Sequence, residues 1–361
     1  MGPTDAAIRP AGSAGPLAWL RANFFGSIPS SLMSLALLAA LAATLPDLVR
    51  WALVDSVWRT ADPAVCRTAG GACWAVIGEK YRVMLFGTYP FDQHWRGYAM
   101  MAIVLTLVGV STVRRLWSGA LLIAWGVGLS AAMVLQLGGV AGLARVPTSL
   151  WGGLPLTLVI FLGTVLGGFP LAVLLALGRQ SRLPVVRALS IGFIETVRGV
   201  PLVNILFVAA LLFPLFMPAG VNFDKLLRAQ VGMLIFFAAY TAESVRGGLQ
   251  AVPHSQYEAA DSLGVSYWER TLKIVLPQAL RIAIPSVVND VIRAFKNTSV
   301  LVIIGLLDLL GGTMAALEDP RWTRFYVEAY LFVAALYFLF CFSLSQYSQK
   351  LEAEMKTGRN Y

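Results

Sequence analysis

Long apolar segments recur along the whole chain and constrain its fold more than any other feature. A helix needs about 20 apolar residues to cross the roughly 30 Å hydrocarbon core of a bilayer. Segments near this length lie at 28–49, 97–113, 117–137, 153–177, 199–217, 229–247, 284–305 and 326–346. The second is short, and the seventh is interrupted by charged residues. The pattern predicts a chain that crosses a membrane about eight times.

Each crossing is expected to be a helix, because only a helix satisfies its own backbone hydrogen bonds in lipid. No segment shows the alternation of a transmembrane β-barrel strand. The composition agrees, since 13% of the residues are charged and 58% are hydrophobic, with a mean hydropathy of +0.72. Soluble proteins carry about 25% charged residues. The predicted fold class is therefore an all-α integral membrane protein.

The distribution of Lys and Arg sets the predicted orientation, because cytoplasmic loops of membrane proteins are enriched in these residues. With the N-terminus in the cytoplasm, most basic residues fall in inside segments, such as the pair Arg114 and Arg115. Both termini are then cytoplasmic, residues 50–96 form an outside loop, and residues 248–281 form an inside loop. The first apolar run is interpreted as a retained helix and not as a cleaved signal. The net charge of +9 has the same origin, so no nucleic acid is expected as a partner.

The cysteines predict one covalent link. Cys66 and Cys73 lie in the outside loop, where an oxidising compartment would favour a disulfide between them; two free thiols are the alternative. Cys341 lies inside an apolar run and is expected to be an inert packing residue. No Cys-x-x-Cys motif or Cys/His cluster occurs, so no metal site is predicted.

The inside loop has the pattern of a helix–turn–helix. Pro253 suits the start of a first short helix, and Gly264 suits the left-handed residue that ends it. Ser266 and Glu269 form a capping box for a second helix, which Pro277 disturbs. A helix of about two turns is not stable alone in water. The first helix therefore needs a surface to dock on, either a partner protein or the membrane.

The same loop resembles the signature loop of permease subunits of bacterial ABC importers. The matching positions are Glu258, Ala259, Ala260, Gly264, Ile274, Leu276 and Pro277, all at the spacing of that family. The flanking segments 195–202, 240–248 and 296–305 resemble polar amino-acid permeases of the histidine/glutamine type. Within that branch, the longer N-terminal portion is similar to general L-amino-acid permeases. The resemblance covers roughly residues 150–350.

This resemblance implies a type I ABC importer permease core at 151–361 with five transmembrane helices and the coupling loop 248–281. Residues 1–150 would then be an N-terminal extension with about three transmembrane helices and a periplasmic loop. In that family the loop docks on an ATPase, which makes Glu258, Ala259, Ala260, Gly264, Leu276 and Pro277 the candidate coupling residues.

The implied partners are an ATPase dimer, a second permease subunit, a periplasmic binding protein and an L-amino-acid substrate, all at a bacterial inner membrane. The second permease is expected to be a different chain, although a homodimer stays open. The sequence has no Gly-x-x-x-x-Gly-Lys-[Ser/Thr] phosphate loop. We therefore expect this chain to be no enzyme and to bind no cofactor, with ATP and Mg on the ATPase subunits.

Ionisable groups at membrane depth point to a substrate path. The candidates are Asn289, Asp290, Arg293, Lys296, Asn297 and Glu243. Asn289, Arg293 and Lys296 share one face of a helix. The alternative is that this helix begins in the cytoplasm and these residues are its wetted end. Pairing of Glu243 with Arg246 competes with a gate contact.

Glu195 and Arg198 precede Gly199-Val200-Pro201, where two interpretations stay open. One is an ion pair at a helix end, and the other is a hinge, because Gly and Pro weaken a helix. Two other classes of function also remain. An ion-driven secondary transporter would require paired repeats, and a membrane scaffold would use the inside loop for binding alone. The spacing from Glu258 to Pro277 favours the ABC permease over both.

Overall fold

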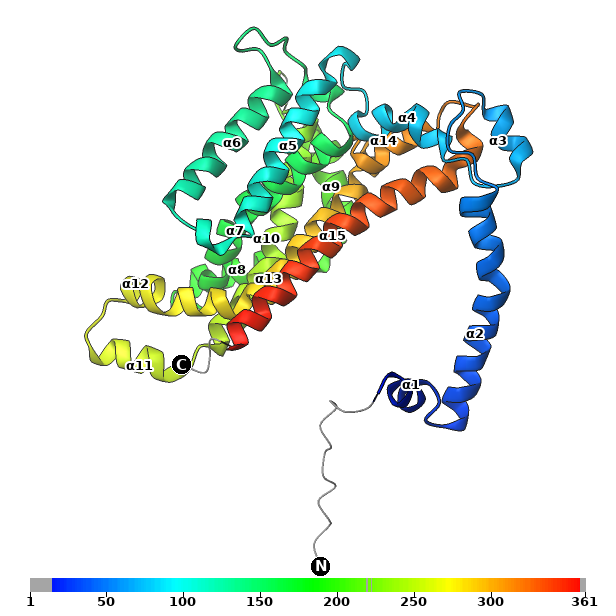
Figure 1. Ribbon diagram of the computed structural model, residues 1–361. Coiled ribbons are helices and arrows are strands. Elements are labelled where there is room, and N and C mark those ends of the chain that lie inside the picture. The colour runs from blue at the N-terminus through cyan, green and yellow to red at the C-terminus, as the bar shows by residue number, and fades with distance from the viewer. Residues whose placement is uncertain (1–14, 219, 222, 358–361) are drawn as a thin grey trace, which may run out of the picture. The chain divides into compact units, whose positions relative to one another are not determined.

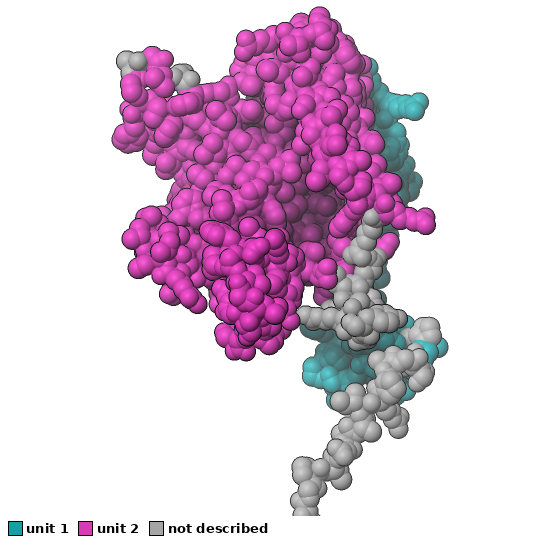
Figure 2. Space-filling view, turned by 90° about the vertical axis from the view of Figure 1, so that its left-hand side faces the viewer, with its two compact units in different colours: residues 1–75 teal, residues 76–361 magenta. Residues whose placement is uncertain are grey.

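The computed structural model describes residues 15–218, 220–221 and 223–357, which form helices and turns without a strand. The chain divides into two compact units, residues 1–75 and residues 76–361 (Figure 2). Each unit is described separately.

In the first unit, α1 (Pro16–Phe24) turns sharply into α2 (Ile28–Val49), which a π-helical turn (Arg50–Val54) extends (Figure 1). The hydroxyl of Ser27 caps the backbone N–H of Ser30, and Ser30 returns the bond to Ser27. This is a capping box, which stabilises the start of α2. The helix from Ile28 to Val54 is long and apolar enough to cross a bilayer, and none of it is buried within the chain.

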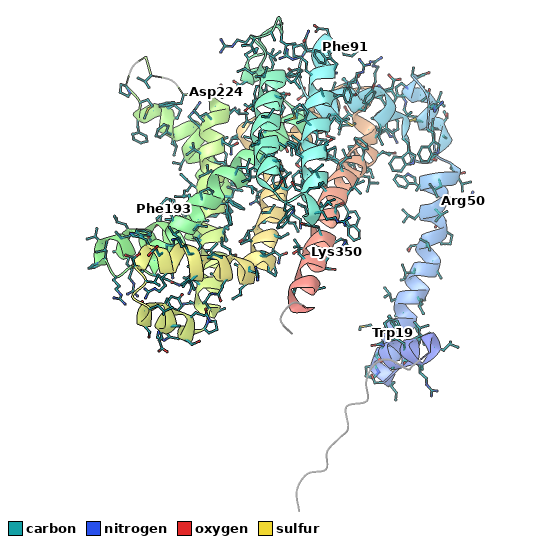
Figure 3. The ribbon with its side chains drawn as sticks, turned by 60° about the vertical axis from the view of Figure 1, so that its left-hand side comes forward. Trp19, Arg50, Phe91, Phe193, Asp224 and Lys350 are labelled. Carbon is teal, nitrogen blue, oxygen red and sulfur yellow. A yellow bond between two sulfur atoms is a disulfide. The ribbon has the colours of Figure 1, made fainter. Side chains whose placement is uncertain are left out.

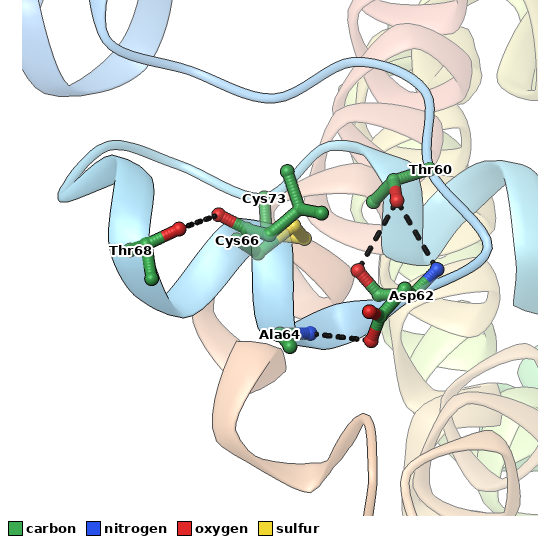
Figure 4. The surroundings of a disulfide bond; sticks show 7 residues. Thr60, Asp62, Ala64, Cys66, Thr68 and Cys73 are labelled. Atoms are coloured by element: carbon green, nitrogen blue, oxygen red, sulfur yellow. Dashed lines mark hydrogen bonds between the residues drawn. A yellow bond between two sulfur atoms is a disulfide. The ribbon is translucent and has the colours of Figure 1, made fainter.

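A disulfide joins Cys66 and Cys73 in the segment that follows α2 (Figure 4). Within the predicted loop 50–96 this segment contains a short helix, α3 (Pro63–Ala69). The Asp62 carboxylate caps α3 by accepting from the Ala64 N–H at 2.9 Å. Both cysteines are buried, so the bridge lies inside the small fold formed by residues 50–75.

The second unit is a helical bundle (Figure 1). Its helices are α4 (Ala75–Phe86), α5 (His94–Ser111), α6 (Gly119–Leu137), α7 (Gly153–Arg179), α8 (Pro184–Gly199), α9 (Leu202–Phe207), α10 (Lys225–Ala251), α11 (His254–Ser262), α12 (Tyr267–Glu269), α13 (Leu276–Asn297), α14 (Leu309–Ala316) and α15 (Tyr326–Thr357). Figure 3 shows Phe91 at one end of this bundle and Lys350 near the other.

Small residues let the central helices approach closely. A Cβ added to Gly168 in α7 would lie 2.6 Å from the ring of Phe237 in α10. A Cβ on Gly248 in α10 would lie 2.3 Å from the carbonyl oxygen of Ala279 in α13. Close approach of this kind is how membrane helices gain van der Waals contact without a hydrophobic driving force. The helices α7, α10 and α13 therefore form the centre of the bundle.

Arg96 shows how the start of α5 tolerates a buried charge. Its side chain is fully buried, and its guanidinium donates to the carbonyl oxygens of Leu135 at 2.5 Å and Ala144 at 2.8 Å. The C-terminal end of α6 is the negative end of the helix dipole, which stabilises a cation there. Arg96 thus joins α5 to the end of α6.

The number of spans is approximate. Five helices within the described residues are long and apolar enough to cross a membrane, or up to six if one bent pair counts as a span. The predicted ranges 97–113 and 229–247 fall on α5 and α10. Neither helix is among the five, because charged residues lower the mean hydropathy of both.

The predicted span 199–217 corresponds to the segment Leu202–Phe216, and a sharp bend lies at its start. There α8 and Leu202–Phe216 meet at 104°. Pro201 lies at this bend and has no backbone N–H with which to continue α8. Beyond α9 the chain continues as π-helical and 3₁₀ turns.

The compact units meet at Ala75, whereas the sequence analysis placed a boundary at residue 150. That boundary was drawn from family resemblance and not from compactness, and it stays a prediction. Within the second unit α5 packs on both α6 and α7, so the structure shows no break at 150.

Asp308 fixes the outer connection between α13 and α15. Its buried carboxylate caps α14 by accepting from the N–H of Gly311 at 3.0 Å and of Leu310 at 3.3 Å. The Tyr337 hydroxyl in α15 donates to the same carboxylate at 3.1 Å. Burial raises the pKa of Asp308 to about 6.

Asp308→Asn should flatten the pH dependence of stability. Because the folded-state pKa lies above the unfolded one, the folded state holds the extra proton, and stability falls as pH rises from about 4 to about 6. The size of this loss is on the order of 3 kcal/mol. Thermal unfolding in detergent at pH 4 and pH 7 measures it. If the Asn variant kept the wild-type difference in unfolding temperature between pH 4 and pH 7, Asp308 would not be the group responsible.

Candidate functional site

The helix α11 is the candidate coupling segment, and one face of it rests on the chain. Ala260 is buried, and the Tyr257 hydroxyl donates to the carbonyl oxygen of Leu249 at the end of α10 at 3.3 Å. Glu258 and Ala259 lie on the exposed side. The Glu258 carboxylate contacts only the neighbouring His254, at 2.9 Å, among the described residues. The helix therefore presents an open surface that includes both candidate residues.

The turn after α11 has the conformation that the sequence indicates. Gly264 has a φ of +68°, in the left-handed region, and a Cβ there would meet no atom within 4 Å. Ser266 caps the next helix through the N–H of Glu269. Arg270 forms an ion pair with Asp261, and its guanidinium lies 5.7 Å from the ring centre of Tyr257. These contacts hold the hairpin in one shape.

The candidate residues Leu276 and Pro277 lie at the start of α13, directly after a π-helical turn (Arg270–Val275). Pro277 has no N–H to continue the regular α-helical pattern, and the wider turn precedes it. Leu263, Trp268 and Leu272 are exposed around the hairpin. The hairpin thus combines a fixed backbone with an apolar, uncovered surface.

Glu243 lies at the centre of an arginine cluster. Its carboxylate is 2.8 Å from Arg246 on the same helix, 3.1 Å from Arg179 at the end of α7 and 3.8 Å from Arg198 at the end of α8. The expected pair with Arg246 is therefore present, but it is one of three. Glu195 pairs with Arg179 at 2.7 Å and Arg198 with Glu243, so of the two open interpretations the ion pair between Glu195 and Arg198 is not formed.

The polar stripe of α13 is divided between two openings. Asp290 is buried, 3.3 Å from Arg293, and accepts from the hydroxyl of Ser244 in α10 at 2.6 Å. With Asn297 these residues line a cavity of about 10 Å³ against α10. That volume is at the lower limit for one water molecule, so it admits no amino acid.

Asn289 and Lys296 face a different opening, which we call the α13–α15 groove. Its volume is about 610 Å³. It is lined by Asn289, Ile292, Lys296, Ser299, Ala334, Tyr337, Phe338, Cys341, Phe342 and Ser345. Cys341 packs against the apolar core, in line with its predicted packing role, and is half-buried at the wall of the groove.

Tyr240 is a site residue that the sequence analysis did not single out. Its ring lies between two guanidinium groups, 5.5 Å from that of Arg198 and 5.2 Å from that of Arg293. It therefore connects the arginine cluster to the Asp290 cavity. The sequence could have indicated Tyr240, because residues 240, 243 and 244 have the i, i+3, i+4 spacing of one face of a helix. The described residues hold no group of three or more candidate metal ligands.

These features define a multi-pass α-helical membrane protein with a helical hairpin between two long helices of its bundle. Residues 168–357 match the family described as binding-protein-dependent transport system inner membrane component. Over 350 residues the chain is 43% identical to the inner membrane amino-acid ABC transporter permease protein YhdY of Escherichia coli, covering 95% of this chain and 94% of the relative. The chain belongs to the amino-acid ABC transporter permease family.

Other similarities agree with this family. The glutamate/glutamine/aspartate/asparagine transport system permease protein BztC of Rhodobacter capsulatus is 36% identical, covering 96% of this chain and 95% of the relative. A solved structure of an amino acid ABC transporter with histidines has a TM-score of 0.50 at 28% identity. The superposition covers 56% of this chain and 92% of the chain in that structure.

Gly264→Val should weaken binding of an ATPase subunit while the bundle still inserts and folds. A β-branched residue in the left-handed region strains the turn, by about 1–2 kcal/mol or more. The matched control is Gly247→Val, because Gly247 also has open space around it but has no positive φ. Co-purification of ATPase with each variant measures the effect. Equal recovery of ATPase with both variants would show that the turn has no such role.

Glu243→Gln should destabilise the bundle, because it leaves the cations of Arg179, Arg198 and Arg246 close together without a counter-charge. The expected loss is on the order of 2 kcal/mol. Glu195→Gln is the control, since it removes a more exposed carboxylate that contacts only one of these arginines. Thermal unfolding in detergent compares the two. A loss as large in the Glu195 variant would argue against a central role for Glu243.

Proposed function

We propose that this chain is the permease subunit of a binding-protein-dependent ABC transporter that imports L-amino acids across a bacterial inner membrane. ATP hydrolysis by a partner ATPase dimer drives alternating access, and this chain contributes no catalytic residue. A periplasmic binding protein delivers the substrate. A second permease subunit, in our proposal a different chain, completes the path.

The observation that carries this proposal is the α11 hairpin. Its backbone is fixed by the contacts of Tyr257 and Arg270, while Glu258, Ala259 and the apolar side chains around Gly264 stay uncovered. A short helix with one side packed and the other open is a docking element for another protein. We place this hairpin in the cytoplasm with both termini, and the segment 50–96 in the periplasm.

The substrate class is supported by the relatives, whose names specify amino-acid transport. The path itself is proposed along α13, with Asn289, Asp290, Arg293, Lys296, Asn297 and Glu243 as its polar groups. The Asp290 cavity is too small for an amino acid. We therefore propose that substrate passes the Asp290 side only in another conformation, in which α13 moves away from α7 and α10, whose residues line the other walls of this cavity.

Reconstitution of the complete transporter in proteoliposomes tests the proposal. Uptake of radiolabelled L-glutamine and L-glutamate should require ATP on the ATPase side and binding protein on the other side. The control is the same complex with a catalytically inactive ATPase subunit. Uptake that persists with the inactive ATPase, or that follows an ion gradient instead, would replace this proposal with secondary transport.

A further inference from the structure

The α13–α15 groove combines an apolar wall with polar side chains, one of them charged. Half of its lining residues are polar: Asn289, Lys296, Ser299, Tyr337 and Ser345. Ionisable groups inside a membrane face a bundle interior, a water-filled cavity or a partner, and rarely lipid. The volume of about 610 Å³ falls within the roughly 300–1,000 Å³ of small-molecule sites. The groove therefore suits a small polar molecule.

Lys296 is the one cation of α13's polar stripe that the structure leaves without an anion. Arg293, one turn away, pairs with Asp290 and lies over the ring of Tyr240. The Lys296 side chain is exposed in the groove, and no carboxylate of the described residues lies within 4.0 Å of its ammonium. An unpaired ammonium in a low-dielectric region is costly. The groove thus attracts an anionic group.

The position of Lys296 along the chain favours a molecule in the groove over a lipid phosphate. Lys296 lies inside the candidate span Tyr267–Ile304, eight residues before its last residue. Lipid phosphates lie outside the hydrocarbon core.

We infer that Lys296 binds the carboxylate of the transported amino acid in the α13–α15 groove. This inference rests on the proposed function and adds the ligand group and its binding residue. The hydroxyl groups of Ser299 and Tyr337 offer hydrogen bonds beside the ammonium, and Phe338 and Phe342 give an apolar wall for the substrate side chain. Since every α-amino acid has this carboxylate, the contact selects for amino acids as a class and not for one side chain.

Cys341 provides a native labelling site with which occupancy of the groove can be measured. Cys341 lines the groove and is the only free cysteine of the described residues, because Cys66 and Cys73 are bridged. In the complete transporter in nanodiscs, L-glutamine should slow maleimide labelling of Cys341 severalfold. The α-amide of L-glutamine, which lacks the carboxylate, should not slow it. Cys341→Ser identifies the labelled site.

Lys296→Gln should abolish the protection by L-glutamine, and Lys296→Arg should retain part of it. Lys350→Gln is the matched control, because Lys350 is exposed on α15 outside the groove and should leave protection unchanged. Equal protection by the amide, or full protection in the Gln variant, would overturn the inference.

Two further outcomes would assign Lys296 another counter-charge and equally overturn it. One is loss of the second permease chain from Lys296→Gln with protection unchanged, which indicates an acid on that chain. The other is protection that depends on anionic lipid in the nanodisc. ATP-driven uptake by the wild-type complex without any protection of Cys341 would leave the proposed function standing and refute only the inference. Absence of uptake would refute the proposed function itself.

Discussion

A charge in a medium of low dielectric constant must be matched, and the second unit is organised around the ways in which this is done. The cation of Arg96 is matched by carbonyl oxygens at the end of α6. The anion of Glu243 is matched by arginines from α7, α8 and α10. Asp290 is matched by Arg293. Each of these contacts joins helices or helix turns that the apolar packing alone would leave free to slide.

Lys296 is the exception to this rule within the polar stripe of α13. It follows Arg293 by about one helical turn, yet it faces α15 instead of α10. On the side of α13 that faces the centre of the bundle, the charges of Asp290 and Arg293 neutralise each other, and Ser244 in α10 donates to Asp290. On the side that faces the groove, the charge of Lys296 has no counter-charge, because no carboxylate of the described residues pairs with it.

The sequence predicted the elements that depend on local or periodic signals. Apolar runs placed the long helices, and Gly264 with Ser266 placed the turn and cap of the coupling hairpin, because these signals arise from backbone conformation and the bilayer thickness. Sequence could not show that Arg198 pairs with Glu243 and not with Glu195, since that depends on how α8 packs against α10. Sequence also could not show that Asn289 and Lys296 line the α13–α15 groove while Arg293 lines the Asp290 cavity. Helical spacing predicts which residues share a face, but not which neighbouring helix covers that face.

The bend between α8 and α9 also bears on the lipid around the protein. Beyond the bend, the segment Leu202–Phe216 is at most roughly 23 Å long at about 1.5 Å per residue. This is shorter than a hydrocarbon core of about 30 Å. A segment of this length that crosses a bilayer by itself requires the bilayer to become locally thinner, or polar ends to be drawn toward it, at a cost that grows with acyl chain length. The thickness of the host membrane would then influence the angle between α8 and Leu202–Phe216 at Pro201.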